Sequence, residues 1–477
     1  MQLWRSLSAV AIALSGCLSA ACGDDDGALD GAAGAGTTEA LPDVPPRLPP
    51  TPVVADFVSA CISGLPELPM PVFPPPAAPM EEDTDGSTST DGTGSSSGDA
   101  DTEDAHASST GDLGGSSTGG DVESSIGASE TASSDDAPPF AGTVAWPLRE
   151  TGHLVGVALA AHRLRTPEYA SVAATQFNYV TPENEMKWNV IERMPGVFDF
   201  RDADTIVEFA RNNHMKVKGH TLVWHSQLPA WVEELQGPEA VREAMERHIR
   251  ETMAHFMEKY PGMVVAWDVV NEAINDTQGN VASFRDSVFY RELGEGFIAE
   301  AFTQARSIDP NAVLLYNDYG IEGLGAKSNA TYEMVRRLVE NGVPIDGVGF
   351  QMHTIGHDFG PPRAEFEQNL RRYIDLGLRV NISEMDVTLC FGYGNAEQAR
   401  VAQRERVRQM VGTCVQFPAC ESVTFWGVAD RDSWLNMRRP CDDTNFQPWP
   451  LLFDDNYHPK PAWYGAYDAF TGCLTWR

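Results

Sequence analysis

Short apolar runs alternate with longer amphipathic stretches between residues 142 and 477, and this alternation predicts the fold. The runs are typical of buried strands, and we expect eight of them, at 154–160, 177–183, 216–223, 264–271, 312–318, 346–352, 379–385 and 422–428. Between them, apolar residues recur every three or four positions, as in 238–260 and 365–377, which predicts helices. Alternating strands and helices indicate an α/β fold, here a (β/α)8 TIM barrel spanning 142–477.

The residues before 142 lack this pattern. Residues 81–141 are rich in Ser, Gly, Thr and Asp, with fifteen acidic residues and no Lys or Arg between 81 and 136. Such a segment has too little apolar surface to offset its ordering entropy, so we expect a disordered acidic tether. Residues 23–80 precede it and include a proline-rich stretch at 41–79, which predicts an extended spacer.

The first 22 residues read as an export signal. Arg5 precedes a short apolar segment that is too short to span a membrane as a helix, and small residues follow it. The segment also resembles a bacterial lipoprotein signal, in which a Cys after the cleavage site is acylated. "LSGC" would place the lipid on Cys17 and "SAAC" on Cys22, and acylation at Cys22 leaves six other cysteines, an even number. We therefore expect a protein exported across the inner membrane and lipid-anchored at the cell envelope or cell surface.

The formal net charge of −34 limits the partners. Nucleic acids and anionic membrane surfaces are bound by positive patches, so neither is expected as a partner, and membrane contact is expected only through the lipid anchor. The charge favours a neutral ligand. We also expect a monomer.

Polar and aromatic residues follow nearly every predicted strand. In a barrel, the ends of the strands converge on one mouth, where active sites lie. The clusters are Glu183-Asn184-Lys187-Trp188, His220-Trp224-His225-Gln227, Asn271-Glu272, Asn317-Asp318-Tyr319, Gln351-His353, Glu384-Asp386, and Trp426 with Asp430 and Trp434. Any one cluster could be polar loop residues without a functional role, but seven clusters at the strand ends predict a single cleft.

Two carboxylates in these clusters carry the expected chemistry. Glu272 ends the fourth predicted strand and Glu384 the seventh, which would place them across the mouth from one another. Such a pair suits glycoside cleavage, with Glu272 as general acid/base and Glu384 as an ionised nucleophile held by groups such as His353. This chemistry requires no metal and no cofactor. The alternative for each residue is a structural salt bridge at a strand end.

Eight motifs then resemble glycoside hydrolase family 10, the endo-β-1,4-xylanases, in the family's order over residues 150 to 470. They are "TPENEMKW" (181–188), "GHTLVWHSQLPAW" (219–231), "WDVVNEA" (267–273), "YNDY" (316–319), "GFQMHT" (349–354), "ISEMD" (382–386), "FWGVADRDSWL" (425–435) and "PLLFDDNYHPKPAW" (450–463). The resemblance implies a retaining enzyme that cleaves xylan, with Glu272 as acid/base and Glu384 as nucleophile.

The resemblance also implies roles for the sugar-binding residues. Glu183, Asn184 and Lys187 would bind sugars on the non-reducing side of the cut. His220, Trp224, Asn271 and Gln351 would hold the sugar under attack, and Trp426 and Trp434 would wall its face. We add Gln227 and His353 as substrate-binding candidates and Asp386 as a support for His353 or Lys187, while Trp267 is expected in the core.

The sequence departs from the family's motifs at two places, and it has six cysteines that could form disulfides. Ser383 and Met385 flank Glu384 where Thr and Leu are common, and Gly320 replaces an expected Asn. Relatives often place a disulfide where Cys414 and Cys420 lie. Cys390 and Cys441 follow the last two strands and are a second candidate pair, which leaves Cys61 with Cys473.

Three functions are compatible with these residues. The first is a lipid-anchored endo-β-1,4-xylanase, and the second is a related retaining hydrolase of β-1,4-glucan. The third is a non-catalytic glycan-binding lipoprotein, which the presence of both carboxylates disfavours.

Overall fold

The computed structural model describes residues 147–276, 283–354, 360–389, 395–438 and 448–472. Eight parallel strands form a closed barrel in the order β1-β2-β3-β4-β5-β6-β8-β9, because β1 pairs with both β2 and β9, and β6 with both β5 and β8. The strands are β1 Leu154–Leu159, β2 Tyr179–Pro182, β3 Lys216–Trp224, β4 Val264–Asn271, β5 Val313–Asp318, β6 Gly347–Phe350, β8 Arg379–Val387 and β9 Cys420–Phe425. Each overlaps one of the eight predicted strands, so the (β/α)8 prediction is confirmed.

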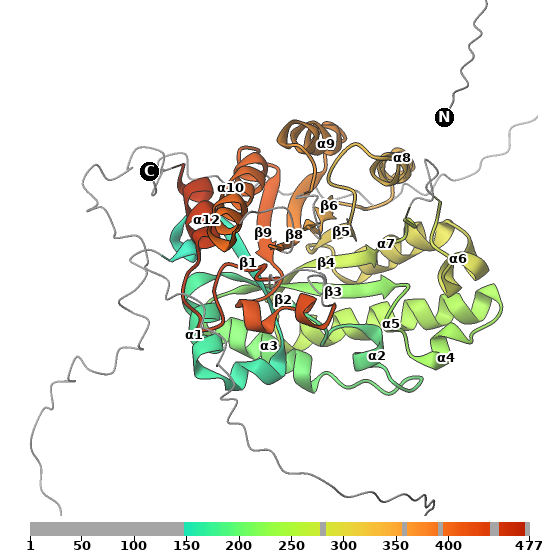
Figure 1. Ribbon diagram of the computed structural model, residues 1–477. Coiled ribbons are helices and arrows are strands. Elements are labelled where there is room, and N and C mark those ends of the chain that lie inside the picture. Colours follow the sequence, from blue (N-terminus) through green and yellow to red (C-terminus); the bar gives the residue numbers. More distant parts are fainter. Residues whose placement is uncertain (1–146, 277–282, 355–359, 390–394, 439–447, 473–477) are drawn as a thin grey trace, which may run out of the picture. The chain divides into compact units, whose positions relative to one another are not determined.

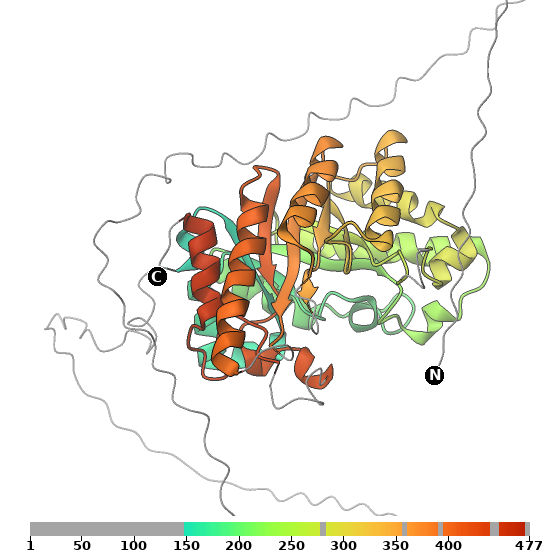
Figure 2. The same ribbon diagram turned by 45° about the horizontal axis from the view of Figure 1, so that its top comes forward.

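Helices surround the barrel in both views of the chain (Figures 1 and 2). The main ones are α1 Pro167–Gln176, α3 Arg201–Asn212, α5 Pro238–Lys259, α7 Gly296–Ile308, α8 Ala326–Glu340, α9 Arg363–Asp375, α10 Ala396–Val415 and α12 Pro461–Thr471. Shorter helices lie in the connections, namely α2 Trp188–Ile191, α4 Ala230–Glu233, α6 Val288–Leu293 and α11 Leu435–Arg438. The helices predicted at 238–260 and 365–377 correspond to α5 and α9. In the described residues, no helix is both long and apolar enough to cross a membrane.

Helix α5 shows how the pattern produces an element. Pro238 occupies its first turn, where a missing N–H costs nothing, and follows Gly237 at a φ of 89°. Apolar residues spaced three or four apart, including Met245, Ile249 and Phe256, are buried toward the barrel. The amphipathic period therefore sets both the helix and the face that it buries.

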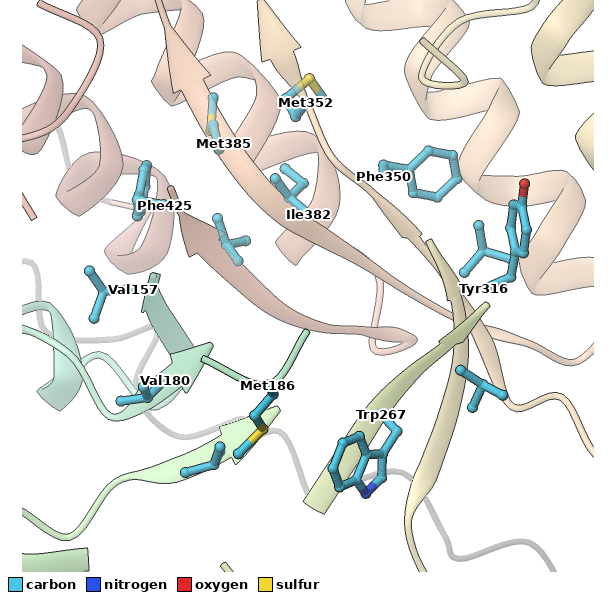
Figure 3. Packing of buried hydrophobic residues seen from close by; sticks show 14 of the residues in the cluster. Val157, Val180, Met186, Trp267, Tyr316, Phe350, Met352, Ile382, Met385 and Phe425 are labelled. Carbon is cyan, nitrogen blue, oxygen red and sulfur yellow. The ribbon is translucent and has the colours of Figure 1, made fainter. Parts of the chain in front are cut away.

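The core packs between the strands and the helices, as Figure 3 shows for Trp267, Tyr316 and Phe350. Trp267 is 1% exposed, which confirms its expected place in the core. Its ring leaves no room on the neighbouring strand, because a Cβ at Gly219 would lie 2.1 Å from it. Burying such a side chain contributes about 1.5–3 kcal/mol, so Gly219 serves the packing of β4 on β3.

The predicted strand at 346–352 is shorter than expected and is followed by a second, very short one. Strand β6 ends at Phe350, and Met352 has a φ of 60°, so the chain turns there. Strand β7, His353–Thr354, then pairs with the end of β8 and places His353 opposite Asp386. This two-residue strand was not predicted, because a run that short has no period.

One of the predicted disulfides lies in the described residues. Cys414, near the end of α10, is bonded to Cys420 at the start of β9, with their Cα atoms 5.5 Å apart. The prediction for this pair is confirmed. Cys17, Cys22, Cys61, Cys390, Cys441 and Cys473 lie outside the described residues.

Candidate active site

Glu272 lies in the turn that ends β4, and neighbouring groups hold it there. Its backbone has a φ of 55°, a left-handed conformation that few residues other than glycine adopt. Its carboxylate accepts hydrogen bonds from Nε1 of Trp224 at 2.9 Å and from Nε2 of Gln351 at 3.0 Å. The apolar strand therefore ends on a buried carboxylate that two polar groups compensate.

Glu384 projects from β8 and is also buried. Asn317 donates to its Oε1 at 2.7 Å, and Nε2 of His353 lies 3.1 Å from its Oε2. Burial alone would raise the pKa of Glu384, but the hydrogen bond from His353 and the charges of nearby His and Lys residues lower it to about 2. The carboxylate is therefore ionised over the whole neutral and mildly acidic range.

His353 links Glu384 to Asp386, two residues further along β8. Its Nδ1 lies 2.8 Å from Oδ2 of Asp386, and that same oxygen accepts from Nε1 of Trp434 at 2.9 Å. Burial lowers the pKa of His353, but the two carboxylates outweigh it and raise the pKa well above its usual value. Asp386 thus contacts His353, one of the two partners expected for it.

Three side-chain amides connect the two glutamates across the mouth. Gln351 contacts Glu272 at 3.0 Å and Asn271 at 3.4 Å, and Asn317 contacts Asn271 at 2.9 Å and Glu384 at 2.7 Å. After a half-turn of its amide, Asn271 would instead accept from Nε1 of Trp224 at 3.2 Å. The amides therefore tie the ends of β4, β5, β6 and β8 into one network.

His220 lies beneath this network on β3. Its Nδ1 is 2.9 Å from Oδ2 of Asp268, an oxygen that also forms an ion pair with Lys218 at 2.8 Å. Trp426 packs edge-on against His220, with ring centroids 5.3 Å apart, and lies 6.2 Å from the ring of His353. The predicted residues from β3 and β9 therefore meet on one wall of the mouth.

The residues expected on the non-reducing side gather after β2. Asn184 Oδ1 accepts from Nζ of Lys187 at 3.0 Å and from Nε2 of Gln227 at 3.3 Å. Nζ of Lys187 also lies 4.9 Å from the centre of the Trp224 ring, which joins this group to Glu272. Burial raises the pKa of Glu183 and lowers that of Lys187, against the opposing effect of nearby opposite charges.

Several residues of the network had no predicted role, although Asn317 and His225 belonged to the clusters expected at the mouth. Asn317 contacts Glu384 directly. Arg285 donates to the backbone carbonyl of Glu272 at 3.0 Å, and Nδ1 of His225 lies 3.9 Å from the carboxylate of Glu272. Lys218 and Asp268 form a buried ion pair below them. The sequence held a signal for this pair, because each charge interrupts an apolar strand and so requires a partner.

One group in the described residues has the composition of a metal site. His220, Asp268 and Glu384 offer ligand atoms within 4.8 Å of one another. Lys218 already places a positive charge beside Asp268, and together with the imidazoles it favours the ionised form of Glu384. Protein cations therefore supply the charge that a metal would bring.

Comparison with known proteins agrees with this geometry. Residues 146–469 match the family model described as Glycosyl hydrolase family 10. Endo-1,4-beta-xylanase B from Thermotoga neapolitana is 41% identical over 302 residues, which cover 62% of this chain and 82% of that protein. A beta-1,4-xylanase from Dictyoglomus thermophilum is 37% identical over 317 residues, which cover 65% of this chain and 86% of that protein.

Solved structures of xylanases resemble this chain as well. The crystal structure of xylanase 10B from Thermotoga petrophila in complex with xylobiose aligns with a TM-score of 0.63 and 37% identity, over 69% of this chain and 98% of that one. The family model also covers well over half of the chain, including every strand of the barrel. This protein therefore belongs to glycosyl hydrolase family 10.

Proposed function

We propose that this chain is an endo-1,4-β-xylanase that cleaves xylan with retention of anomeric configuration. Its family membership supports the reaction class, and its relatives from Thermotoga neapolitana and Dictyoglomus thermophilum carry xylanase names. The Thermotoga petrophila structure binds xylobiose, which supports a β-1,4-linked xylose chain as the substrate.

The observation that carries the mechanism is the contrast between the two glutamates. Glu384 is ionised, since hydrogen bonding and nearby cations hold its pKa at about 2. Glu272 contacts two donors, Trp224 and Gln351, and no cation lies as close to its carboxylate as His353 lies to Glu384 among the described residues. Surroundings that differ in this way let one carboxyl group act as the nucleophile and the other as the acid.

In the first step, Glu272 donates its proton to the glycosidic oxygen while a carboxylate oxygen of Glu384 attacks the anomeric carbon. The bond between that carbon and the leaving oxygen breaks, and its electron pair goes to the oxygen, which leaves as a hydroxyl group. A covalent ester between the xylose unit and Glu384 forms.

In the second step, the carboxylate of Glu272 takes a proton from water as the water oxygen attacks the anomeric carbon. The ester bond breaks, Glu384 returns to its ionised form, and Glu272 is protonated again. Two inversions at the same carbon give net retention. Asn271 would bond the sugar 2-hydroxyl as positive charge develops.

The remaining predicted residues would form the sugar-binding surface. Glu183, Asn184, Lys187 and Gln227 gather after β2 and β3, which supports binding of the non-reducing side there. Trp426 and Trp434 present aromatic surface beside His353, and flat indole rings suit the C–H faces of pyranoses. His353 contacts both the ring of Trp434 and Glu384, and His220 lies against Trp426 and close to Glu384.

A Glu384→Ala variant tests this proposal. We expect it to bind xylo-oligosaccharides and to hydrolyse none, because the ester cannot form. Glu300→Ala is the matched control, since Glu300 of α7 pairs with Arg242 of α5 in a partly exposed contact between two outer helices, and it should keep full turnover. Unchanged hydrolysis by Glu384→Ala would refute the nucleophile assignment.

Substrate choice separates the two enzymatic alternatives. Xylan and cello-oligosaccharides differ by the C5 hydroxymethyl group, so their relative kcat/KM distinguishes a xylanase from a β-1,4-glucanase. NMR of the first product, observed before mutarotation, distinguishes retention from inversion. Wild-type protein that binds xylan but releases no reducing sugar would instead support the glycan-binding alternative.

A further inference from the structure

Residues of the neighbouring strand β5 hold the turn that carries Glu272, together with Arg285, which donates to the carbonyls of Glu272 and Ile274. The phenol oxygen of Tyr316 accepts hydrogen bonds from the N–H groups of Ala273 at 3.0 Å and Ile274 at 3.3 Å. These are the two residues directly after Glu272, whose own N–H donates to the carbonyl of Asn317 at 2.8 Å. A left-handed residue persists only where its surroundings determine it, and here β5 and Arg285 provide those surroundings.

The hydroxyl of Tyr316 has its proton directed away from the turn. It donates to Oδ2 of Asp318 at 2.6 Å, which leaves its lone pairs for the two N–H groups. Oδ1 of Asp318 accepts from the backbone of Tyr319 and lies 2.9 Å from Nζ of Lys327, so the carboxylate is itself held. Tyr316 and Asp318 are both fully buried.

The alternation of side chains along β5 separates two tasks. Tyr316 and Asp318 lie on one face of the strand, behind the turn after β4, while Asn317 between them faces the mouth and contacts Glu384. One strand thus contacts the nucleophile with one residue and supports the acid/base with its two neighbours.

We propose that Tyr316, oriented by Asp318 and Lys327, is a positioning residue that aims the carboxyl group of Glu272 at the glycosidic oxygen. This inference rests on the acid/base role proposed above for Glu272. Tyr316 does not contact the substrate or the reacting atoms. It sets the backbone from which the catalytic carboxyl group projects, and proton transfer depends steeply on that geometry.

A comparison of two substrates tests the proposal on a Tyr316→Phe variant. Xylan has a poor leaving group that needs protonation, whereas an aryl xylobioside with an acidic phenol needs little. We expect kcat/KM on xylan to fall by about 10- to 100-fold, with a change of no more than about twofold on the aryl substrate, since its glycosylation step needs little acid.

Tyr260→Phe is the matched control. The hydroxyl of Tyr260 also donates to a carboxylate, that of Glu208 at 3.0 Å, but it lies before β4, at the other end of the barrel. It should leave both substrates unaffected. If Tyr316→Phe does not fold, as judged by thermal unfolding, Asp318→Asn replaces it, because this variant weakens the acceptor of the tyrosine proton and also removes the charge that pairs with Lys327.

The outcomes are separable. A Tyr316→Phe or Asp318→Asn variant that matches Tyr260→Phe, or that loses activity equally on both substrates, would overturn the positioning role. A Glu272→Ala variant serves as the reference and should lose about 10²- to 10⁴-fold on xylan and far less on the aryl substrate. Equal losses for Glu272→Ala would instead refute the proposed acid/base role.

Discussion

Nε2 of His353 lies 3.1 Å from the carboxylate of Glu384, and the histidine is held in that position by Asp386 on its other side. Because each partner stabilises the charged form of the other, the pKa of the histidine is raised and that of Glu384 is lowered. The imidazolium therefore keeps the nucleophile ionised inside an apolar barrel, where burial alone would favour a neutral carboxyl group.

Replacing His353 by Gln should shift the acid side of the pH–rate profile to higher pH. In the native protein the pKa of Glu384 is about 2, so its ionisation does not limit kcat/KM in mildly acidic buffer. Without the imidazolium, its hydrogen bond and its charge no longer offset burial, so the pKa of Glu384 rises above its native value. A pH profile of kcat/KM on an aryl xylobioside measures the shift, and an acid limb that stays in place would show that His353 does not control the nucleophile.

The same pair predicts a window of stability. The lowered pKa of Glu384 contributes stability that is present above the usual value of 4.5 and is lost as pH falls toward 2. The raised pKa of His353 contributes stability that is present below 6.5 and is lost as pH rises through its folded value. The melting temperatures of the native protein and of His353→Gln should therefore differ most between pH 4.5 and pH 6.5, where both contributions are present. A constant difference across pH would contradict the linkage.

Removing the disulfide should lower stability without lowering the turnover rate. Cys414 and Cys420 are six residues apart, and closing so short a loop contributes about 2 kcal/mol by restricting the unfolded chain. The bond lies where β9 begins, at the end of the barrel opposite the mouth. A Cys414→Ser/Cys420→Ser variant should unfold at lower urea concentration and keep its kcat at 25 °C. A lower kcat in the folded variant would show that the bond supports the site.

The lipid anchor predicted from the first 22 residues is tested by two cysteine variants. If Cys22 is acylated, Cys22→Ser should release the protein from the membrane fraction, and the mass increase from acyl chains should disappear. Cys17→Ser is the natural control and should remain membrane-bound, since its position then lies in the removed signal. The reverse result would place the lipid on Cys17, and release by neither variant would argue against a lipoprotein.

The barrel was predictable because parallel strands covered by helices read as apolar runs. The predicted runs at 264–271 and 312–318 end on Asn271 and Asp318, and so do β4 and β5. Strand β7 was not predictable, since two residues carry no period, although its His353 was a candidate through its position after the sixth run.

Part of the network at the mouth depends on geometry that the sequence does not encode locally. Asn317 could be placed at a strand end, but its contact with Glu384 depends on the register of β5 beside β6 and β8. The support of the Glu272 turn by Tyr316 likewise joins residues 43 positions apart. Pairs of this kind become visible only when the barrel closes.

The buried ion pair between Lys218 of β3 and Asp268 of β4 tests how much such a contact between strands stabilises the barrel. Both side chains are at most 1% exposed, and His220 contacts the same carboxylate oxygen as the lysine. Replacing Lys218 by Met should destabilise the fold by about 3–5 kcal/mol, because it leaves a buried carboxylate without its main counter-charge. Adding Asp268→Asn to Lys218→Met should recover part of this loss, since the remaining groups are then neutral and can hydrogen-bond.

Urea unfolding, monitored by tryptophan fluorescence, measures the free energy of unfolding of both variants. Catalysis should respond in the same direction as stability. The charge of Lys218 is among those that lower the pKa of Glu384, so Lys218→Met should move the acid side of the pH–rate profile upward. The double variant should move it back in part, because Asp268→Asn removes a negative charge within 4.8 Å of Glu384. If Lys218→Met unfolds at the native urea midpoint, the pair does not stabilise the barrel, and Asp268 must be compensated by His220 alone.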